Sequence, residues 1–132
     1  MIQITKRFLL IDDDRINNYI TKMILQKTFE GVEVIDFIDA EVGLEFIKSE
    51  PKNIVINEKT TLFLDINMPT LSGWEFLEAF ALFDEEIKNQ YNIYILSSSI
   101  NISDINLANE NHFVLDFIEK PVNKVKLVKL FS

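Results

Sequence analysis

The sequence contains no cysteine and a single histidine among its 132 residues. The absence of cysteine excludes a disulfide framework, metal sites built on thiolates and a thiol nucleophile. None of the three glycines belongs to a Walker loop or a dinucleotide-binding fingerprint, so the common nucleotide-binding motifs are missing. The histidine, His112, lies in the polar run "NENHF", which is typical of a surface turn.

Basic residues are scarce, because 13 lysines and arginines stand against 21 aspartates and glutamates, for a net charge of -8. Direct nucleic-acid binding, which usually needs a basic surface, is therefore not expected. No apolar run approaches the roughly 20 residues of a membrane span. The start, "MIQITKRFLLIDDD", has too short an apolar run for a signal peptide and no small-residue cleavage site. We expect a cytoplasmic protein without membrane partners.

Short apolar runs alternate with stretches of helical periodicity, and 48% of the residues are hydrophobic, which is enough for one folded core. The first helical stretch carries apolar residues at helical spacing, namely Ile16, Ile20, Met23 and Ile24. Asp14 and Asp39 are suited to cap the first two helices. The pattern predicts strands at 8–11, 32–37, 62–64, 93–96 and 113–118, and helices at 14–27, 39–48, 74–88, 104–111 and 122–131, the third of them bent.

The stretch "SEPKNIVINEK" before the third predicted strand is expected to form a loop, with room for a short extra strand at 53–57. A tolerated surface insertion and a partner-specific contact are both open for this 49–60 loop. Five strands alternating with five helices predict an α/β fold with a parallel sheet. The strands are apolar on both sides, as expected when helices cover both faces. In such folds the functional site lies beyond the carboxyl ends of the strands.

Polar groups stand at four of the predicted strand ends: Asp12 and Asp13, Asp65, Ser97 and Lys120. Each has an ordinary explanation alone, since aspartates cap helices and serines form loops. Four independent strand ends that supply complementary groups favour one shared site. Two like charges about 5 Å apart repel by roughly 3 kcal/mol at an effective dielectric constant near 20. The adjacent aspartates are therefore tolerated only if water solvates them, a helix start absorbs their charge or a cation binds them.

These groups suit phosphoryl chemistry. Mg²⁺ is typically held by one or two carboxylates together with phosphate oxygens. One aspartate can then act as the nucleophile on phosphorus and form an aspartyl phosphate. The Lys120 ammonium, the Ser97 hydroxyl and the cation would each meet one oxygen of the phosphoryl group. The residues therefore predict a Mg²⁺-dependent phosphoryl site.

The motifs "LLIDDD", "LFLDINMPTLSGWEFL", "IYILSSS" and "FIEKPV" follow one another along the chain, which resembles the receiver domain of two-component response regulators over essentially its whole length. The resemblance implies a flavodoxin-like (βα)5 three-layer sandwich with five parallel strands in the order 2-1-3-4-5. It also implies a single stand-alone receiver domain over residues 1–132 without an output domain. Such a domain is a signalling module and not an enzyme, apart from its own phosphotransfer and dephosphorylation.

The resemblance also implies the metal site. Asp65 would be the phosphoacceptor. Asp13 would bind Mg²⁺ directly, Asp12 would act through water, and Asp65 and the backbone carbonyl of Asn67 would be further ligands. Mn²⁺ is an alternative metal. Asn67 and Ser99 would flank the path of the attacking water and tune dephosphorylation.

The phosphate-binding and switch residues follow from the same resemblance. Lys120 would bind the phosphoryl group, and Pro121 would follow it through a cis bond. Ser97 would be the switch hydroxyl and Phe117 the switch aromatic. Many members have tyrosine or histidine at the position of Phe117, so here the switch would depend on packing alone.

The resemblance implies a histidine kinase or a histidine-phosphotransfer protein as phosphodonor. A downstream protein would dock on the face formed by helix 104–111, strand 113–118 and helix 122–131. The alternative is a receiver fold that binds partners independently of phosphorylation. A haloacid-dehalogenase-like phosphatase fits less well, because it needs a second aspartate where this chain has Asn67. A flavodoxin would need a hydroxyl- and glycine-rich phosphate loop in place of "DDDRIN".

Overall fold

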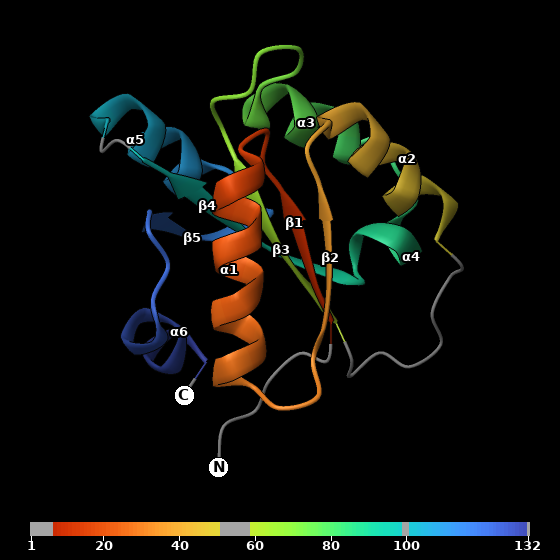
Figure 1. Cartoon of the computed structure of the whole chain (residues 1–132). Coiled ribbons are helices and arrows are strands. Elements are labelled where there is room, and N and C mark those ends of the chain that lie inside the picture. The colour runs from red at the N-terminus through yellow and green to blue at the C-terminus, as the bar shows by residue number, and fades with distance from the viewer. Residues whose placement is uncertain (1–6, 51–58, 99–100, 132) are drawn as a thin grey trace.

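The computed structural model describes residues 7–50, 59–98 and 101–131, and the strands of this part form one parallel five-stranded sheet (Figure 1). The strand order is β2-β1-β3-β4-β5, which confirms the predicted fold class and topology. This order makes β1 and β3 direct neighbours, with Ile11 opposite Leu64. The bounds are β1 Arg7–Ile11, β2 Glu33–Phe37, β3 Thr60–Asp65, β4 Tyr91–Ser97 and β5 Val114–Glu119.

Helices cover both faces of the sheet (Figure 1). Within the described residues they are α1 Arg15–Thr28, α2 Ala40–Ser49, α3 Gly73–Phe80, α4 Glu85–Lys88, α5 Ile102–Glu110 and α6 Lys124–Leu130. The helices α1 and α6 pack on one face, and α2, α3 and α4 on the other. No helix in the described part is both long and apolar enough to cross a membrane.

The side chains of β1 alternate between the two cores, because successive residues of a strand point to opposite faces. Phe8 and Leu10 pack with α1 and α6, whereas Leu9 and Ile11 pack with the helices of the opposite face. All four side chains are at most 2% exposed. Burial on both faces explains why this strand reads as an uninterrupted apolar run.

Most of the apolar stripe that predicts α1 lies on the solvent side of the helix, and only Ile24 of its four residues packs against the core. Ile16 is 71% exposed and Ile20 is 44% exposed, whereas the buried face carries Asn18 and Leu25. The Asn18 amide donates a hydrogen bond to the backbone carbonyl of Asp12 at 2.9 Å. This buried polar contact fixes the rotation of the helix, so the spacing of the isoleucines predicts the helix but not its buried face.

The predicted helix 74–88 is broken into α3 and α4, so the described part of the chain has six helices where five are predicted. Asp84 adopts an extended backbone between them. The Lys88 ammonium donates to the carbonyl of Ala81 at 3.0 Å and so caps the end of α3. The break turns the chain back, so that Ile87 packs in the same core as Phe80.

Two more predicted helices are shifted at their ends. The helix predicted at 104–111 begins at Ile102, because Asn101 caps it by accepting from the N–H of Ser103. The helix predicted at 122–131 begins at Lys124 after the cap Asn123. The extra strand predicted at 53–57 lies outside the described residues.

Arg7 contacts both Glu50 and Thr60, at the end of the sheet opposite the predicted site. Its guanidinium forms an ion pair with Glu50 and donates to the hydroxyl of Thr60 at 2.9 Å. The Tyr91 hydroxyl donates to the Glu50 carboxylate at 3.3 Å. Burial and the neighbouring Glu50 charge raise the pKa of Tyr91 well above its usual value, so its hydroxyl stays protonated.

Gly73 allows the start of α3 to pack directly against the end of β3. Its N–H donates to the carbonyl of Ile66 at 3.1 Å. A Cβ atom at this position would lie 2.7 Å from the Ile66 Cα and 2.8 Å from the Asp65 carbonyl oxygen. Ser72 and Glu75 complete a capping box around this helix start. The loop after Asp65 is therefore held against the helix that follows it.

Gly73→Ala should lower the free energy of unfolding by about 1–3 kcal/mol, because the added Cβ meets backbone atoms that cannot rotate away. Gly43→Ala is the control in α2, where the Cβ would meet the end of the Ile11 side chain instead of backbone atoms. Urea denaturation measures both variants. An equally large loss in both, or none in Gly73→Ala, would contradict the importance of this close approach.

Candidate functional site

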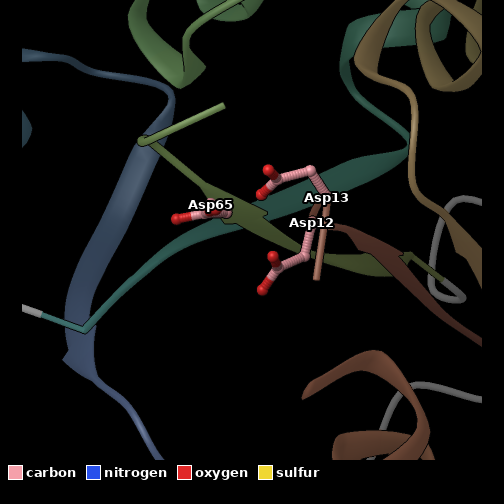
Figure 2. A group of neighbouring side chains, drawn as sticks. All are labelled: Asp12, Asp13 and Asp65. Carbon is pink, nitrogen blue, oxygen red and sulfur yellow. The ribbon is translucent and has the colours of Figure 1, made fainter. Parts of the chain in front are cut away.

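Three aspartates meet beyond the carboxyl ends of β1 and β3 (Figure 2). Asp12 and Asp13 follow β1, and Asp65 is the last residue of β3. One carboxylate oxygen from each lies within 4.8 Å of the others. Asp12 and Asp65 are 3% and 5% exposed, whereas Asp13 is open to solvent. The juxtaposition predicted from the strand ends is therefore present in the structure.

The buried carboxylate of Asp12 has three donors. Its Oδ1 accepts from the backbone N–H of Asp14 at 3.0 Å. Its Oδ2 accepts from Lys120 Nζ at 2.6 Å and from Asn17 Nδ2 at 2.8 Å. Charge-assisted hydrogen bonds of this kind compensate a buried carboxylate for its lost hydration. Asp14 itself caps α1, as predicted, by accepting from the N–H groups of Ile16 and Asn17.

Lys120 brings the positive charge to the site from the end of β5. Its Nζ also lies 3.7 Å from Asp65 Oδ1, so one ammonium contacts both buried carboxylates. The backbone N–H of Lys120 donates to the carbonyl of Ser97 at 2.8 Å, which ties the turn after β5 to the end of β4. The Lys120–Pro121 bond is cis, as the resemblance implies. Lys126 donates to the carbonyls on either side of Lys120, those of Glu119 at 2.8 Å and Pro121 at 3.1 Å.

The electrostatic surroundings raise the pKa of Asp65 from 3.8 to about 6. Burial is the largest cause, followed by the charge of Asp12, and Asp13 adds a smaller increase. Lys120 and the N–H of Asn67 lower the pKa but do not offset these effects. Asp65 thus lies in an excess of negative charge that a cation would relieve.

Three of the remaining predicted residues, Ser97, Asn67 and Phe117, belong to the described part of the chain. Ser97 is fully buried at the end of β4. Asn67 is exposed, and its N–H donates to Asp65 Oδ1 at 3.3 Å. Phe117 lies half-buried on β5, opposite Ile95 of β4. Ser99 lies outside the described residues.

The donor chemistry of the cluster fits a divalent cation. Three carboxylates within 4.8 Å offer hard oxygen ligands, which Mg²⁺ and Mn²⁺ prefer. Asp12, Asp13 and Asp65 could hold such an ion. The exposed side of the cluster, at Asp13, leaves room for water or phosphate oxygens to complete the coordination.

Two features near the site are not predicted from the sequence. The amides of Asn17 and Asn18 both reach Asp12, one at the side chain and the other at the backbone. The indole N–H of Trp74 donates to Asp104 at 3.1 Å and links the start of α3 to α5. These contacts depend on the rotation of helices relative to the sheet, for which the local sequence gives no signal.

Comparison with known proteins identifies the family. The model of the response regulator receiver domain matches residues 8–132. The chain belongs to the response-regulator receiver domain family. Receiver domains of this family act in two-component signalling, so the strand-end cluster lies in a signalling domain.

Solved receiver structures share this fold over nearly their whole length. The response regulator receiver protein from Dyadobacter fermentans matches with a TM-score of 0.84 and 25% identity, covering 94% of this chain and 93% of that chain. The two component response regulator from Cytophaga hutchinsonii matches with a TM-score of 0.81 and 25% identity, covering 98% of this chain and 96% of that chain.

A curated relative is the stress response regulator protein 1 of Meyerozyma guilliermondii, 35% identical over 69 residues. The match covers 52% of this receiver domain and 29% of the relative, so the chain matches less than a third of the length of that protein.

Asp65→Asn should stabilise the metal-free receiver domain at pH 7. Because folding raises the pKa of Asp65 from 3.8 to about 6, the native state binds more protons than the unfolded chain between these values. The stability that Asp65 contributes is present below pH 3.8 and is lost as the pH rises through 6. The substitution should therefore raise the free energy of unfolding at pH 7 in EDTA by about 1–3 kcal/mol, and by less at pH 4.

Urea denaturation at the two pH values measures this difference. Asp39→Asn is the control, because it removes an equal charge from an exposed helix cap that asparagine can also provide. The role assigned to Asp65 is wrong if Asp65→Asn raises the free energy of unfolding at pH 7 no more than this control does, or raises it equally at both pH values.

Proposed function

We propose that this receiver domain is a cytoplasmic phosphoacceptor, modified on Asp65 in a Mg²⁺-dependent reaction. The phosphodonor is a phosphohistidine of a histidine kinase or a histidine-phosphotransfer protein. The observation that carries the proposal is the position of Asp65, a buried carboxylate with two acidic neighbours and the Lys120 ammonium 3.7 Å away. This combination suits a nucleophile whose product carries additional negative charge.

The transfer forms one bond and breaks one. An oxygen of the Asp65 carboxylate attacks phosphorus, and the bond between phosphorus and the histidine nitrogen breaks. The nitrogen keeps the electron pair and takes up a proton as neutral imidazole is released. Asp65 must be ionised to attack, and a pKa of about 6 leaves it largely ionised at pH 7.5 even without metal.

The surrounding residues have separate tasks in this proposal. Asp12, Asp13, Asp65 and the carbonyl of Asn67 hold Mg²⁺, or Mn²⁺, which supplies positive charge for the phosphoryl oxygens. Lys120 moves from Asp12 onto a phosphoryl oxygen, a small displacement because it already contacts both carboxylates.

The hydroxyl of Ser97 donates a hydrogen bond to another phosphoryl oxygen and thereby pulls the end of β4 toward the site. Asn67, which is exposed, tunes together with Ser99 the access of water and hence the lifetime of the phosphoryl group.

Output is proposed to occur by docking on α5, β5 and α6. Phe117 links the site to this surface, because it packs against the core and also lines a groove of about 470 Å³ between β5 and α6. A change in the packing of Phe117 would alter the groove and thereby the affinity for a partner. Exposed apolar side chains on these elements, namely Leu107, Leu115 and Val125, support a protein partner.

The exposed stripe on α1 supports a protein phosphodonor. Ile16, Tyr19 and Ile20 are 71%, 66% and 44% exposed on the helix that begins directly after the acidic cluster. A partner that covers these side chains would be held beside Asp65 while its phosphohistidine reacts. Apolar side chains gathered on one exposed helix face are typical of an interaction surface.

Incubation with acetyl phosphate and Mg²⁺ should add one phosphoryl group to the wild-type protein, measured by intact-mass spectrometry. Asp65→Asn should add none, and EDTA should prevent the addition to the wild type. Asp39→Asn should be modified normally. Full modification of Asp65→Asn, or undiminished modification without divalent metal, would contradict the proposal, and an unmodified wild type would favour a binding module independent of phosphorylation.

Lys120→Met should slow the formation of phosphorylated protein by roughly 100-fold, because a preorganised positive charge is lost from the transition state. Lys124→Met on the exposed start of α6 is the matched control and should react at the wild-type rate. Circular dichroism checks that both variants are folded. A folded Lys120→Met variant that reacts as fast as Lys124→Met would exclude the assigned role.

A further inference from the structure

The first turns of α1 direct two adjacent asparagines at Asp12. The amide of Asn17 donates to the carboxylate Oδ2 at 2.8 Å. The amide of Asn18 donates to the Asp12 carbonyl at 2.9 Å and to the Phe37 carbonyl at 3.4 Å, and Asn18 is 2% exposed. One asparagine thus holds the side chain of Asp12, and the next holds its backbone at the end of β1.

Helix formation does not account for asparagine at position 17. Asparagine is a poorer helix former than alanine or leucine, because its side chain competes for backbone hydrogen bonds. Asn17 is half-buried and therefore contributes little to an apolar core. The side-chain amide of Asn17 contacts the Asp12 carboxylate, and this contact points to a task at the acidic cluster.

Asn17 and Lys120 share one oxygen of Asp12. Lys120 Nζ lies 2.6 Å from Oδ2, while the other oxygen, Oδ1, accepts from the N–H of Asp14 at 3.0 Å. In the function proposed above, Lys120 leaves Asp12 for a phosphoryl oxygen. Among the contacts of the described residues, Asn17 then remains as the side-chain donor to Oδ2.

A neutral amide suits this position better than a second cation. It keeps the buried carboxylate hydrogen-bonded, which avoids the cost of an unpaired buried charge. It adds no positive charge that would repel a divalent cation at Asp13 and Asp65. It also has no charge that would draw it onto the phosphoryl group together with Lys120.

We propose that Asn17 is a positioning residue for metal binding, which holds the Asp12 carboxylate in the orientation that receives Mg²⁺. This inference rests on the proposed function of the acidic cluster. Hydrogen-bond partners of metal ligands orient those ligands, and their loss typically weakens metal binding by 10- to 100-fold. Asn17 acts through Asp12 and does not touch the transferred group.

Titration calorimetry with Mg²⁺, without a phosphodonor, tests the proposal directly. Asn17→Ala should raise the Kd for Mg²⁺ by about tenfold or more. Its thermal stability should change little, because Lys120 still pairs with Asp12 and alanine offsets part of the lost hydrogen bond by favouring the helix. Asn109→Ala on the exposed face of α5 is the matched control and should bind Mg²⁺ as the wild type does.

The shared oxygen gives a second test. In a Lys120→Met background, Asn17→Ala removes the last side-chain donor to Oδ2 among the described residues. The fold-change in Kd caused by Asn17→Ala should therefore be larger in this background than in the wild type. An equal or smaller fold-change would show that the two donors do not share the task of holding Asp12.

The outcomes separate this inference from the proposed function. If the wild type gains a phosphoryl group in Mg²⁺ and Asn17→Ala binds Mg²⁺ as tightly as the wild type, the role of Asn17 is wrong and the proposed function stands. If the wild type does not bind Mg²⁺, both are wrong. The positioning role would also be overturned if Asn17→Ala and Asn109→Ala both bound Mg²⁺ more weakly and both had a lower thermal stability than the wild type.

Discussion

The burial of two neighbouring carboxylates is the constraint on which the rest of the structure depends. Asp12 and Asp65 are 3% and 5% exposed, and each charge without partners would cost several kcal/mol in such a place. The fold brings Lys120 from the end of β5 to both of them and turns backbone N–H groups toward their oxygens. The negative charge is still in excess, as the pKa of about 6 for Asp65 indicates. The cation that we propose for this site would make use of this excess.

The strand-end residues of the cluster were predictable because a parallel sheet places all its carboxyl ends at one edge. Asp12, Asp13 and Asp65 each follow a short apolar run, and the strand order puts β1 beside β3. The start of α3 also carries a local signal, since Ser72 and Glu75 have the spacing of a capping box. The strand-end aspartates and the start of α3 could therefore be predicted, because each is indicated by a pattern of a few neighbouring residues.

Features that depend on how one element is rotated against another could not be predicted. The isoleucines of α1 indicate a helix, but the buried hydrogen bonds of Asn18 decide which side faces the sheet. The same rotation brings Asn17 to the Asp12 carboxylate and leaves Ile16 and Ile20 at the surface. One polar requirement thus shapes the acidic cluster and the neighbouring apolar surface together, and we propose that a protein partner covers this surface.

Chemical trapping of the modified residue tests the central claim most directly. Borohydride reduces an aspartyl phosphate to homoserine, and peptide mass spectrometry locates the change in the chain. After treatment with acetyl phosphate and Mg²⁺, we expect homoserine at position 65 and its loss when EDTA is present. Homoserine at position 12 or 13, or an unchanged Asp65 in a folded protein supplied with Mg²⁺, would contradict the account.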